Sequence, residues 1–251
     1  MKIWNKINKS LTFDEIDPYK NFCNITWENK VKKKILENYK KLISNKTIKS
    51  NYFAACSPLP FLLISHTKKK IKICDFGSGG LEVYFQIQTL NIKKSFFIDA
   101  VEVPQIVKLY KKLKIKYLKN SKKTNISFLD HYDFKKKYDI VHISDSLQYI
   151  KNWKSFIKKI IKTKPKYIIL NNLTAGEIPE YSTVQNFYNK KIFYKFFNLK
   201  QIIKSFRNYH LVYSGQYLNK INGKYIEYPQ SNFKKADRLS FPCTVILKLK
   251  P

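Results

Sequence analysis

The stretch IKICDFGSGG, residues 71–80, decides the fold of this 251-residue chain. Residues 71–76 form a short, mostly apolar run, which predicts a buried strand. The next four residues include Gly77, Gly79 and Gly80, half of the six glycines in the whole chain. Because glycine has no Cβ, the backbone there can turn tightly and approach a ligand closely. The stretch therefore predicts a strand that ends in a ligand-binding turn.

Similar apolar runs recur downstream and predict further strands at 95–103, 125–130, 138–144, 166–172, 209–215 and 243–249. Amphipathic segments predict helices at 81–90, 104–119, 151–163 and 198–207. Strands that alternate with helices form right-handed crossovers and a parallel sheet that is covered on both sides. We therefore expect an α/β, Rossmann-like fold with a mostly parallel sheet, helices on both faces and an antiparallel C-terminal edge.

The segments outside this pattern predict an N-terminal cap and two insertions. Residues 1–66 are expected to be a helical cap and linker, because apolar residues recur there every three or four positions and two prolines interrupt 56–63. Residues 67–251 are expected to form the Rossmann-like domain. Within it, the irregular stretch near 173–197 and the polar, aromatic insert near 216–241 are expected to form lids over the ligand site.

The charge of the chain is strongly positive, but its composition argues against nucleic-acid recognition. The formal net charge is +32, yet only two of the 49 basic residues, Arg207 and Arg238, are arginines. Proteins that read bases and phosphates directly rely on the bidentate guanidinium group. The lysines are dispersed, and a genome rich in A and T explains their number. We expect no specific nucleic-acid partner, although the field should loosely attract anionic substrates and anionic membrane surfaces.

Cysteines and histidines give no sign of a metal site or a disulfide framework. The four cysteines lie far apart and form no C-x-x-C pair, at positions 23, 56, 74 and 243. The histidines at 66, 131 and 210 lack the spacing of metal ligands. The N-terminus has no apolar core of the signal-peptide type, and the longest apolar patch, 58–64, is too short to span a bilayer. These observations predict a cytoplasmic protein.

The spacing of the glycines limits the classes of ligand that the turn is expected to bind. The G-x-x-x-x-G-K-[ST] pattern of a P-loop is absent. Counting from Gly77 and Gly79 places Glu82 where a dinucleotide fingerprint has its third glycine, and a carboxylate is a poor neighbour for a pyrophosphate. An adenosyl cofactor without phosphates is the remaining candidate ligand. The acidic Asp75 suits S-adenosylmethionine, which carries an ammonium and a sulfonium group.

The second predicted strand supplies a carboxylate for a ribose. Its end reads VEVP at 101–104, where Glu102 can accept hydrogen bonds from both ribose hydroxyls. Asp99 is the alternative. Glu102 is preferred because Pro104 marks the end of the strand, and ligands bind at that end.

These motifs together resemble those of the class I S-adenosylmethionine-dependent methyltransferases. The matching pieces are DFGSG followed by YFQ at 84–86, VEVPQIV at 101–107, YDIVHIS at 138–144, SDSLQYI at 144–150 and TVQ at 183–185. The chain looks closest to a poorly characterised bacterial branch that is often encoded beside surface-polysaccharide genes. It departs from the pattern at Leu81, where such proteins have a third glycine. Gly80 is expected to supply the missing flexibility.

The resemblance implies a role for each candidate residue. Asp75, Gly77, Gly79 and Gly80 would line the methionine end of the cofactor. Glu102 would hold the ribose, and Asp130 the adenine amino group. Ser144, Asp145 and Gln148 would face the transferred methyl group.

The resemblance also implies methyl transfer to a small polar acceptor, such as a sugar or a surface-polysaccharide precursor. Asp145 is the expected general base, whereas His142 is interpreted as a packed strand histidine. A nucleic-acid methyltransferase and a protein that has lost catalysis are the alternatives. The oligomeric state is not predicted.

Overall fold

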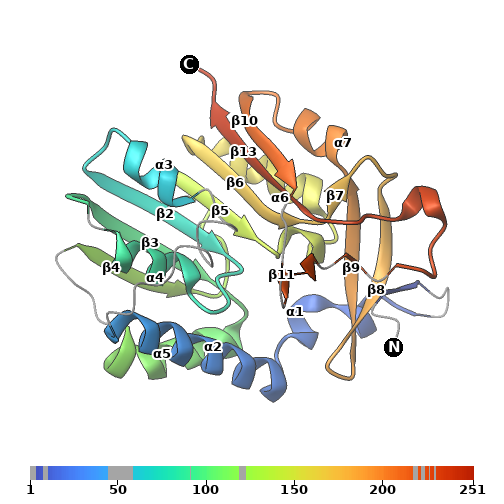
Figure 1. Ribbon diagram of the computed structural model, residues 1–251, viewed down its shortest axis with the longest axis horizontal. Helices are drawn as coiled ribbons and strands as arrows, with labels where there is room; N and C mark the ends of the chain where they lie inside the picture. The colour runs from blue at the N-terminus through green and yellow to red at the C-terminus, as the bar shows by residue number, and fades with distance from the viewer. Residues whose placement is uncertain are drawn as a thin grey trace.

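The larger of two main β-sheets forms the centre of the molecule (Figure 1). The computed structural model describes residues 4–7, 11–44, 59–90, 92–118, 123–216, 220–221, 224–225, 227–228 and 230–251. The strands of this sheet are β2 (Lys70–Phe76), β3 (Ser95–Val101), β4 (Thr124–Leu129), β5 (Ile140–Ser144), β6 (Tyr167–Leu173), β10 (Tyr209–Gln216) and β13 (Cys243–Leu249). They lie in the order β10-β13-β6-β5-β2-β3-β4, and all of them were expected near these positions.

The direction of the strands confirms the predicted fold class. Strands β2 to β6 run parallel to one another, whereas β13 runs antiparallel to both β6 and β10. The C-terminal edge is therefore antiparallel, as expected, and β13 lies one strand in from the edge strand β10. The strand order reverses between β2 and β5, and open α/β sheets bind their ligands outside the carboxyl ends of the strands at such a point.

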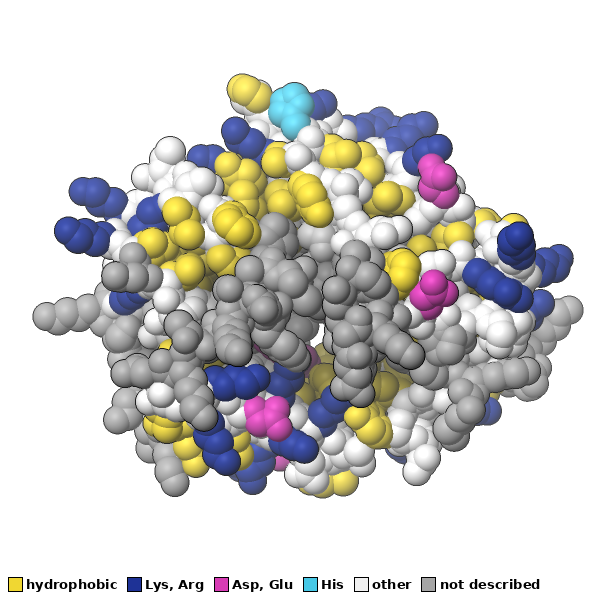
Figure 2. All heavy atoms as spheres, in the orientation of Figure 1, with side chains coloured by type: hydrophobic (Ala, Val, Ile, Leu, Met, Phe, Trp, Pro, Cys, Tyr) yellow, Lys and Arg dark blue, Asp and Glu magenta, His cyan; other side chains and the backbone are white. Residues whose placement is uncertain are grey.

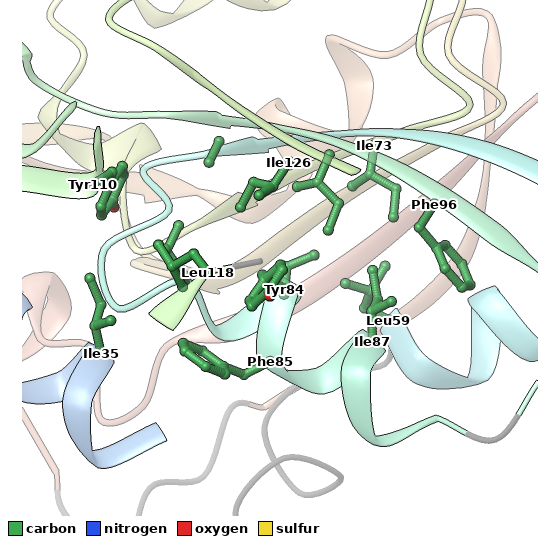
Figure 3. Packing of buried hydrophobic residues seen from close by; sticks show 14 of the residues in the cluster. Ile35, Leu59, Ile73, Tyr84, Phe85, Ile87, Phe96, Tyr110, Leu118 and Ile126 are labelled. Carbon is green, nitrogen blue, oxygen red and sulfur yellow. The ribbon is translucent and has the colours of Figure 1, made fainter. Parts of the chain in front are cut away.

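Helices cover both faces of this sheet. On one face lie α2 (Ile25–Ile43), α3 (Leu59–Ser65), α4 (Glu82–Thr89) and α5 (Pro104–Tyr117), and on the other α6 (Trp153–Lys162) and α7 (Leu199–Lys204). Figure 3 shows part of the first cluster, in which Ile73 of β2 lies with Phe85 of α4 and Ile35 of α2. Each of these three side chains is fully buried.

A second, smaller sheet is formed by residues of the N-terminal segment, expected to be helical, and of the stretch 173–197, expected to be irregular. Its strands are β1 (Trp4–Lys6), β7 (Ala175–Gly176), β8 (Tyr181–Phe187) and β9 (Lys190–Asn198), in the order β1-β8-β9-β7. The prediction that 173–197 is irregular is therefore wrong. The turn of the β8–β9 hairpin has left-handed backbone at Tyr188 and Asn189, and such turns are usually recognised by glycine. Without a glycine there, the hairpin signal was missed.

The N-terminal segment combines a strand with helices and packs against the rest of the chain. Besides α2, it contains the short helices η1 (Asp14–Ile16) and α1 (Pro18–Asn21), and β1 pairs with β8. Of the stretch 56–63, expected as a linker, residues 59–63 belong to helix α3, and 56–58, with Cys56, lie outside the described residues. The division of the chain at residue 66 stays a prediction. Among the helices of the described ranges, none is long and apolar enough to cross a membrane.

The remaining described elements are short. They are η2 (Leu147–Tyr149), η3 (Lys235–Asp237) and a two-stranded ribbon of β11 (Lys220–Ile221) and β12 (Lys224–Tyr225). Of the insert expected at 216–241, residues 217–219, 222–223, 226 and 229 lie outside the described residues.

Leu81 itself adopts the conformation that a third glycine would have. It caps helix α4 with φ 58° and ψ 38°, in the left-handed region, whereas the φ of Gly80 is not positive. The expectation that Gly80 supplies the flexibility is therefore wrong. Left-handed backbone costs a leucine about 1–2 kcal/mol. The side chain of Leu81 is 1% exposed within the core, and burying a leucine stabilises by about 2–5 kcal/mol, so its burial outweighs the strain.

Two substitutions of Leu81 distinguish the effect of backbone strain on stability from the effect of side-chain burial. Leu81→Ala loses the buried side chain and keeps the strained backbone, whereas Leu81→Gly loses the side chain and relieves the strain. We expect both variants to be less stable than the wild type, and Leu81→Gly to be more stable than Leu81→Ala by about 1 kcal/mol. Urea denaturation measures this difference. An alanine variant as stable as the glycine variant would contradict the strained conformation.

Candidate functional site

The candidate site lies where the carboxyl ends of the parallel strands meet the second sheet. Loops that follow β2, β3 and β5 converge there, because these strands are neighbours in the large sheet. Figure 2 shows the molecule hollowed near the centre of this face, with acidic and apolar side chains recessed in the hollow. The loop after β2 is the glycine turn.

The glycine turn is fixed by contacts to both neighbouring strands. The backbone N–H groups of Gly77 and Ser78 donate to the carbonyl of Val101, at 2.9 and 3.2 Å. A Cβ on Gly77 would lie 2.5 Å from the Cβ of Ser146, so only glycine fits beneath the loop after β5. Among the described residues, the nearest atom to a Cβ on Gly79 would be the carbonyl oxygen of Gly77, at 3.9 Å, an ordinary van der Waals contact. Gly77 therefore permits close packing with Ser146, whereas Gly79 is not closely packed by the described residues.

Gly80 has a different neighbour, the N-terminal helix α2. A Cβ on Gly80 would lie 2.7 Å from the Cδ atom of Lys34. The ammonium group of Lys34 forms an ion pair with Glu82, and the side chain of Asn38 donates to the carbonyl of Gly80 at 3.3 Å. The absence of a side chain at Gly80 thus lets α2 approach the turn.

Glu102 is held at the turn, directly after β3. Its carboxylate accepts hydrogen bonds from the N–H of Gly79 at 3.2 Å and from the N–H of Val103 at 2.9 Å. Burial raises the pKa of Glu102 to about 7, and these two hydrogen bonds oppose the shift. The alternative acid, Asp99, accepts from Lys136 and Tyr138 instead, at 2.8 Å each. The structure thus brings Glu102, and not Asp99, to the glycine turn.

Asp75 and His142 form a buried pair beneath the turn. They are direct neighbours in the register of β2 and β5, and their side chains are joined by a 2.8 Å hydrogen bond between Oδ1 and Nδ1. Burial raises the pKa of Asp75, although the hydrogen bond to His142 lowers it. His142 is 5% exposed, which agrees with its interpretation as a packed strand histidine. Asp75 therefore lies in the layer that supports the turn.

The loop after β5 presents Asp145 in a strained conformation. Its φ is 50°, in the left-handed region, and its N–H donates to the carbonyl of Asn171 at 3.0 Å. Its carboxylate accepts from the amide of Gln148, which is fully buried. Asp145 is exposed to solvent, yet desolvation by the protein around its carboxylate raises its pKa to about 7, and the charges of Lys34 and Lys30 oppose this shift. Such strain and such pKa values are typical of functional sites.

The two other predicted residues lie differently. Ser144 is half-buried at the end of β5, and its hydroxyl accepts from Asn171 at 3.4 Å. Asp130 is exposed after β4, two strands away from β2, and pairs with His131 at 2.6 Å. This hydrogen bond lowers the pKa of Asp130. The structure therefore places Asp130 at the rim of the sheet, and Glu102 and Asp145 at the ends of β3 and β5, the two strands on either side of β2.

Three tyrosines near Asp145 were not identified from the sequence. They are Tyr149 of η2, Tyr194 of β9 and Tyr228 before η3, and burial followed by neighbouring charges, including that of Asp145, raises the pKa of each hydroxyl. The hydroxyl of Tyr149 donates to Gln185 at 3.0 Å. The ring of Trp4 packs against Tyr194 and Tyr228, with centroids 5.6 and 5.0 Å apart. We call Trp4, Tyr149, Tyr194 and Tyr228 the aromatic wall.

The aromatic wall is assembled from four segments that are distant in the sequence. Tyr194 and Tyr228 come from the two expected lid insertions, whereas Trp4 comes from β1. Aromatic density in the insertions was the available signal, but it does not distinguish a site from a packed core. Within the part of the chain that the structure describes, no group of three His, Cys, Asp or Glu side chains is placed to hold a metal ion.

Comparisons with known proteins relate the chain to others through structure alone. No protein-family model and no curated protein matches its sequence. Among solved structures, it is similar to 1,6-didemethyltoxoflavin-N1-methyltransferase of Burkholderia thailandensis, with 11% identity, a TM-score of 0.51, and coverage of 99% of this chain and 95% of that chain.

Two further structures show weaker similarity. Magnesium protoporphyrin IX methyltransferase of Synechocystis PCC 6803 is 11% identical over 92% of this chain and 97% of that chain, with a TM-score of 0.49. An S-adenosylmethionine-dependent methyltransferase of Clostridium acetobutylicum is 12% identical over 87% of this chain and 99% of that chain, with a TM-score of 0.47. The similarity to the Burkholderia structure and the strand order show that the chain has the class I, Rossmann-like methyltransferase fold.

Proposed function

We propose that the protein is an S-adenosylmethionine-dependent methyltransferase that acts on a small polar acceptor. The observation that carries this proposal is the carboxylate of Glu102, held by two backbone N–H groups beside a glycine turn in which Gly79 is not closely packed by the described residues. A carboxylate at the end of the second strand of such a sheet is suited to bind the two hydroxyls of a ribose. The structural neighbour from Burkholderia contains bound S-adenosylhomocysteine, which supports the same cofactor here.

The charges around the turn also fit this cofactor. Beyond the effect of desolvation, the charge of Glu82 raises the pKa values of Asp75, Glu102 and Asp145, and the charge of Asp75 raises that of Glu102, so all these acids lie near Glu82. Such an acidic site would repel a pyrophosphate, whereas it stabilises the ammonium and sulfonium groups of S-adenosylmethionine. Gly79, which the described residues do not pack closely, leaves room for a ligand against the backbone.

Each residue would then have a defined task in the reaction. When bound, S-adenosylmethionine supplies a methyl group that is activated by the sulfonium. Glu102 would orient the cofactor through its ribose. Asp145 would accept the proton that the acceptor loses, since a carboxylate with a pKa of about 7 is half ionised at neutral pH. Gln148 would hold the Asp145 carboxylate in place. Positioning of the acceptor would supply much of the remaining rate.

The aromatic wall supports a hydroxylated acceptor, and we propose a sugar or a surface-polysaccharide precursor. Three tyrosine hydroxyls, two glutamine amides and the Asp145 carboxylate lie in one neighbourhood. An acceptor with hydroxyl groups could exchange hydrogen bonds with these side chains, whereas an acceptor without polar groups could not. Planar heterocycles are the competing class, because the Burkholderia enzyme binds one. Nucleic acid is the weaker candidate, because only two of the 49 basic residues of the chain are arginines.

Binding of S-adenosylhomocysteine tests the cofactor. At a hundred times its Kd, the ligand should stabilise the wild type by about 2.7 kcal/mol in thermal or chemical unfolding. Glu102→Ala should weaken binding about 10- to 100-fold, because hydrogen bonds to a charged group are lost. Glu177→Ala is the matched control, since it removes an exposed carboxylate that pairs with Lys200 in a 3.5 Å contact. No binding by the wild type, or equal binding by Glu102→Ala, would contradict the proposal.

The raised pKa of Glu102 predicts a pH dependence of cofactor binding. Below pH 7 the free protein holds a proton on Glu102, which must leave before the carboxylate can accept two hydroxyls. The affinity for S-adenosylhomocysteine should therefore rise as the pH increases from 6 to 7 and level off near pH 8, by up to about tenfold per pH unit at the acidic end. Calorimetry at several pH values measures this slope. Glu102→Gln should bind more weakly and flatten the profile, and an equal slope in both proteins would exclude Glu102 as its source.

The role of Asp145 is tested by Asp145→Asn. This variant keeps the shape of the side chain and removes the base, so kcat should fall about 10²- to 10⁴-fold while the Kd of S-adenosylhomocysteine changes less than about threefold. Transfer of labelled methyl groups is measured with sugars, nucleotide sugars, planar heterocycles and RNA. Transfer only to heterocycles or to RNA would reject the proposed sugar acceptor but would still support methyltransferase activity. An Asp145→Asn variant with normal kcat would show that the base lies elsewhere.

A further inference from the structure

Lys34 of helix α2 lies across the glycine turn. Its Cγ and Cδ atoms would lie 2.8 and 2.7 Å from a Cβ on Gly80. Its ammonium group pairs with Glu82, at the start of α4, and its charge lowers the pKa of Asp145. The aliphatic part of the side chain therefore covers Gly80, and the charged end lies among the acids of the site.

Helix α2 is held firmly in this position. Val31 and Ile35, on the same helix, are buried in the core against α4 and α5. Polar contacts lie at both ends: Glu28 accepts from the side chain of Gln105 at 2.6 Å, and Asn38 donates to the carbonyl of Gly80. Because the backbone on both sides of Lys34 is anchored, its side chain can change partner without movement of the helix.

A bound cofactor would require a positive charge near the glycine turn, because its methionine end includes a negatively charged group. The methionine end of S-adenosylmethionine carries an ammonium group and also a carboxylate. The acids Asp75, Glu82, Glu102 and Asp145 suit the ammonium group, but they would repel an uncompensated carboxylate. Two lysines influence Asp145, Lys30 and Lys34. The ammonium of Lys30 lies over the rings of Phe187 and Tyr188, 5.8 and 5.2 Å from their centroids, and so faces the hairpin rather than the turn.

We propose that Lys34 binds the carboxylate of the cofactor's methionine end and exchanges Glu82 for it when the cofactor binds. This inference rests on the proposed function. It makes α2, which lies outside the Rossmann-like domain expected from the sequence, a part of the cofactor site. It also gives a reason for the third glycine of the cluster, since Gly80 admits the side chain of Lys34.

Decarboxylated S-adenosylmethionine makes a direct test, because it keeps the ammonium and the sulfonium but lacks the carboxylate. Binding of S-adenosylmethionine and of this analogue is measured by calorimetry for the wild type and for Lys34→Met, which keeps the aliphatic length and removes the charge. Lys34→Met should bind S-adenosylmethionine about 10- to 100-fold more weakly, as expected for loss of a charge-assisted hydrogen bond. Its affinity for the decarboxylated analogue should change by less than about threefold.

Lys33→Met is the matched control. It removes the same charge from the neighbouring, exposed position of α2, and should leave both affinities within about twofold of the wild type. Equal weakening of both ligands by Lys34→Met, or no weakening of either, would overturn the inference. Tighter binding of both would also overturn it, because Lys34 would then compete with the cofactor's ammonium. A wild type that binds neither ligand would instead refute the proposed function, and urea denaturation of each variant shows that it is folded.

Discussion

The close contact between the loops after β2 and β5 is the constraint on which the site depends. Ser146 packs directly on the backbone of Gly77 and donates to the carbonyl of Phe76 at 2.9 Å, so the two loops are locked together at the reversal of strand order. The same turn is tied to β3, because the N–H of Gly77 donates to Val101. These contacts fix the backbone from which the side chains of Glu102 and Asp145 extend. The positions of both carboxylates therefore depend on them.

Electrostatics gives the site a character opposite to that of the whole molecule. The chain carries a net charge of +32, yet four acids gather around the glycine turn. Desolvation by the surrounding protein disfavours the ionised forms of Glu102 and Asp145, whose pKa values rise to about 7. Lys34 compensates part of this charge from α2. The lysines elsewhere can raise the local concentration of an anionic substrate, but they do not define the chemistry at the turn.

Strain and packing are balanced against each other at the same place. Leu81 and Asp145 both have left-handed backbone, which disfavours residues with a Cβ. Leu81 is kept in this conformation by a fully packed side chain, and Asp145 by hydrogen bonds of its N–H and its carboxylate. Both residues follow parallel strands at their carboxyl ends, Leu81 in the turn after β2 and Asp145 directly after β5. Packing and hydrogen bonds thus offset the strain of the two left-handed residues beside the site.

Sequence patterns were enough to predict the α/β fold, the seven strands of the large sheet and the glycine turn, because apolar periodicity and glycine spacing are local properties of the chain. The position of Pro104 also favoured Glu102 over Asp99. Which side chains meet became known from the folded chain alone: Asp130 lies at the rim, 173–197 contains a hairpin, and Lys34 and the aromatic wall lie near Asp145. These contacts join segments far apart in the sequence, and no local pattern encodes such a meeting.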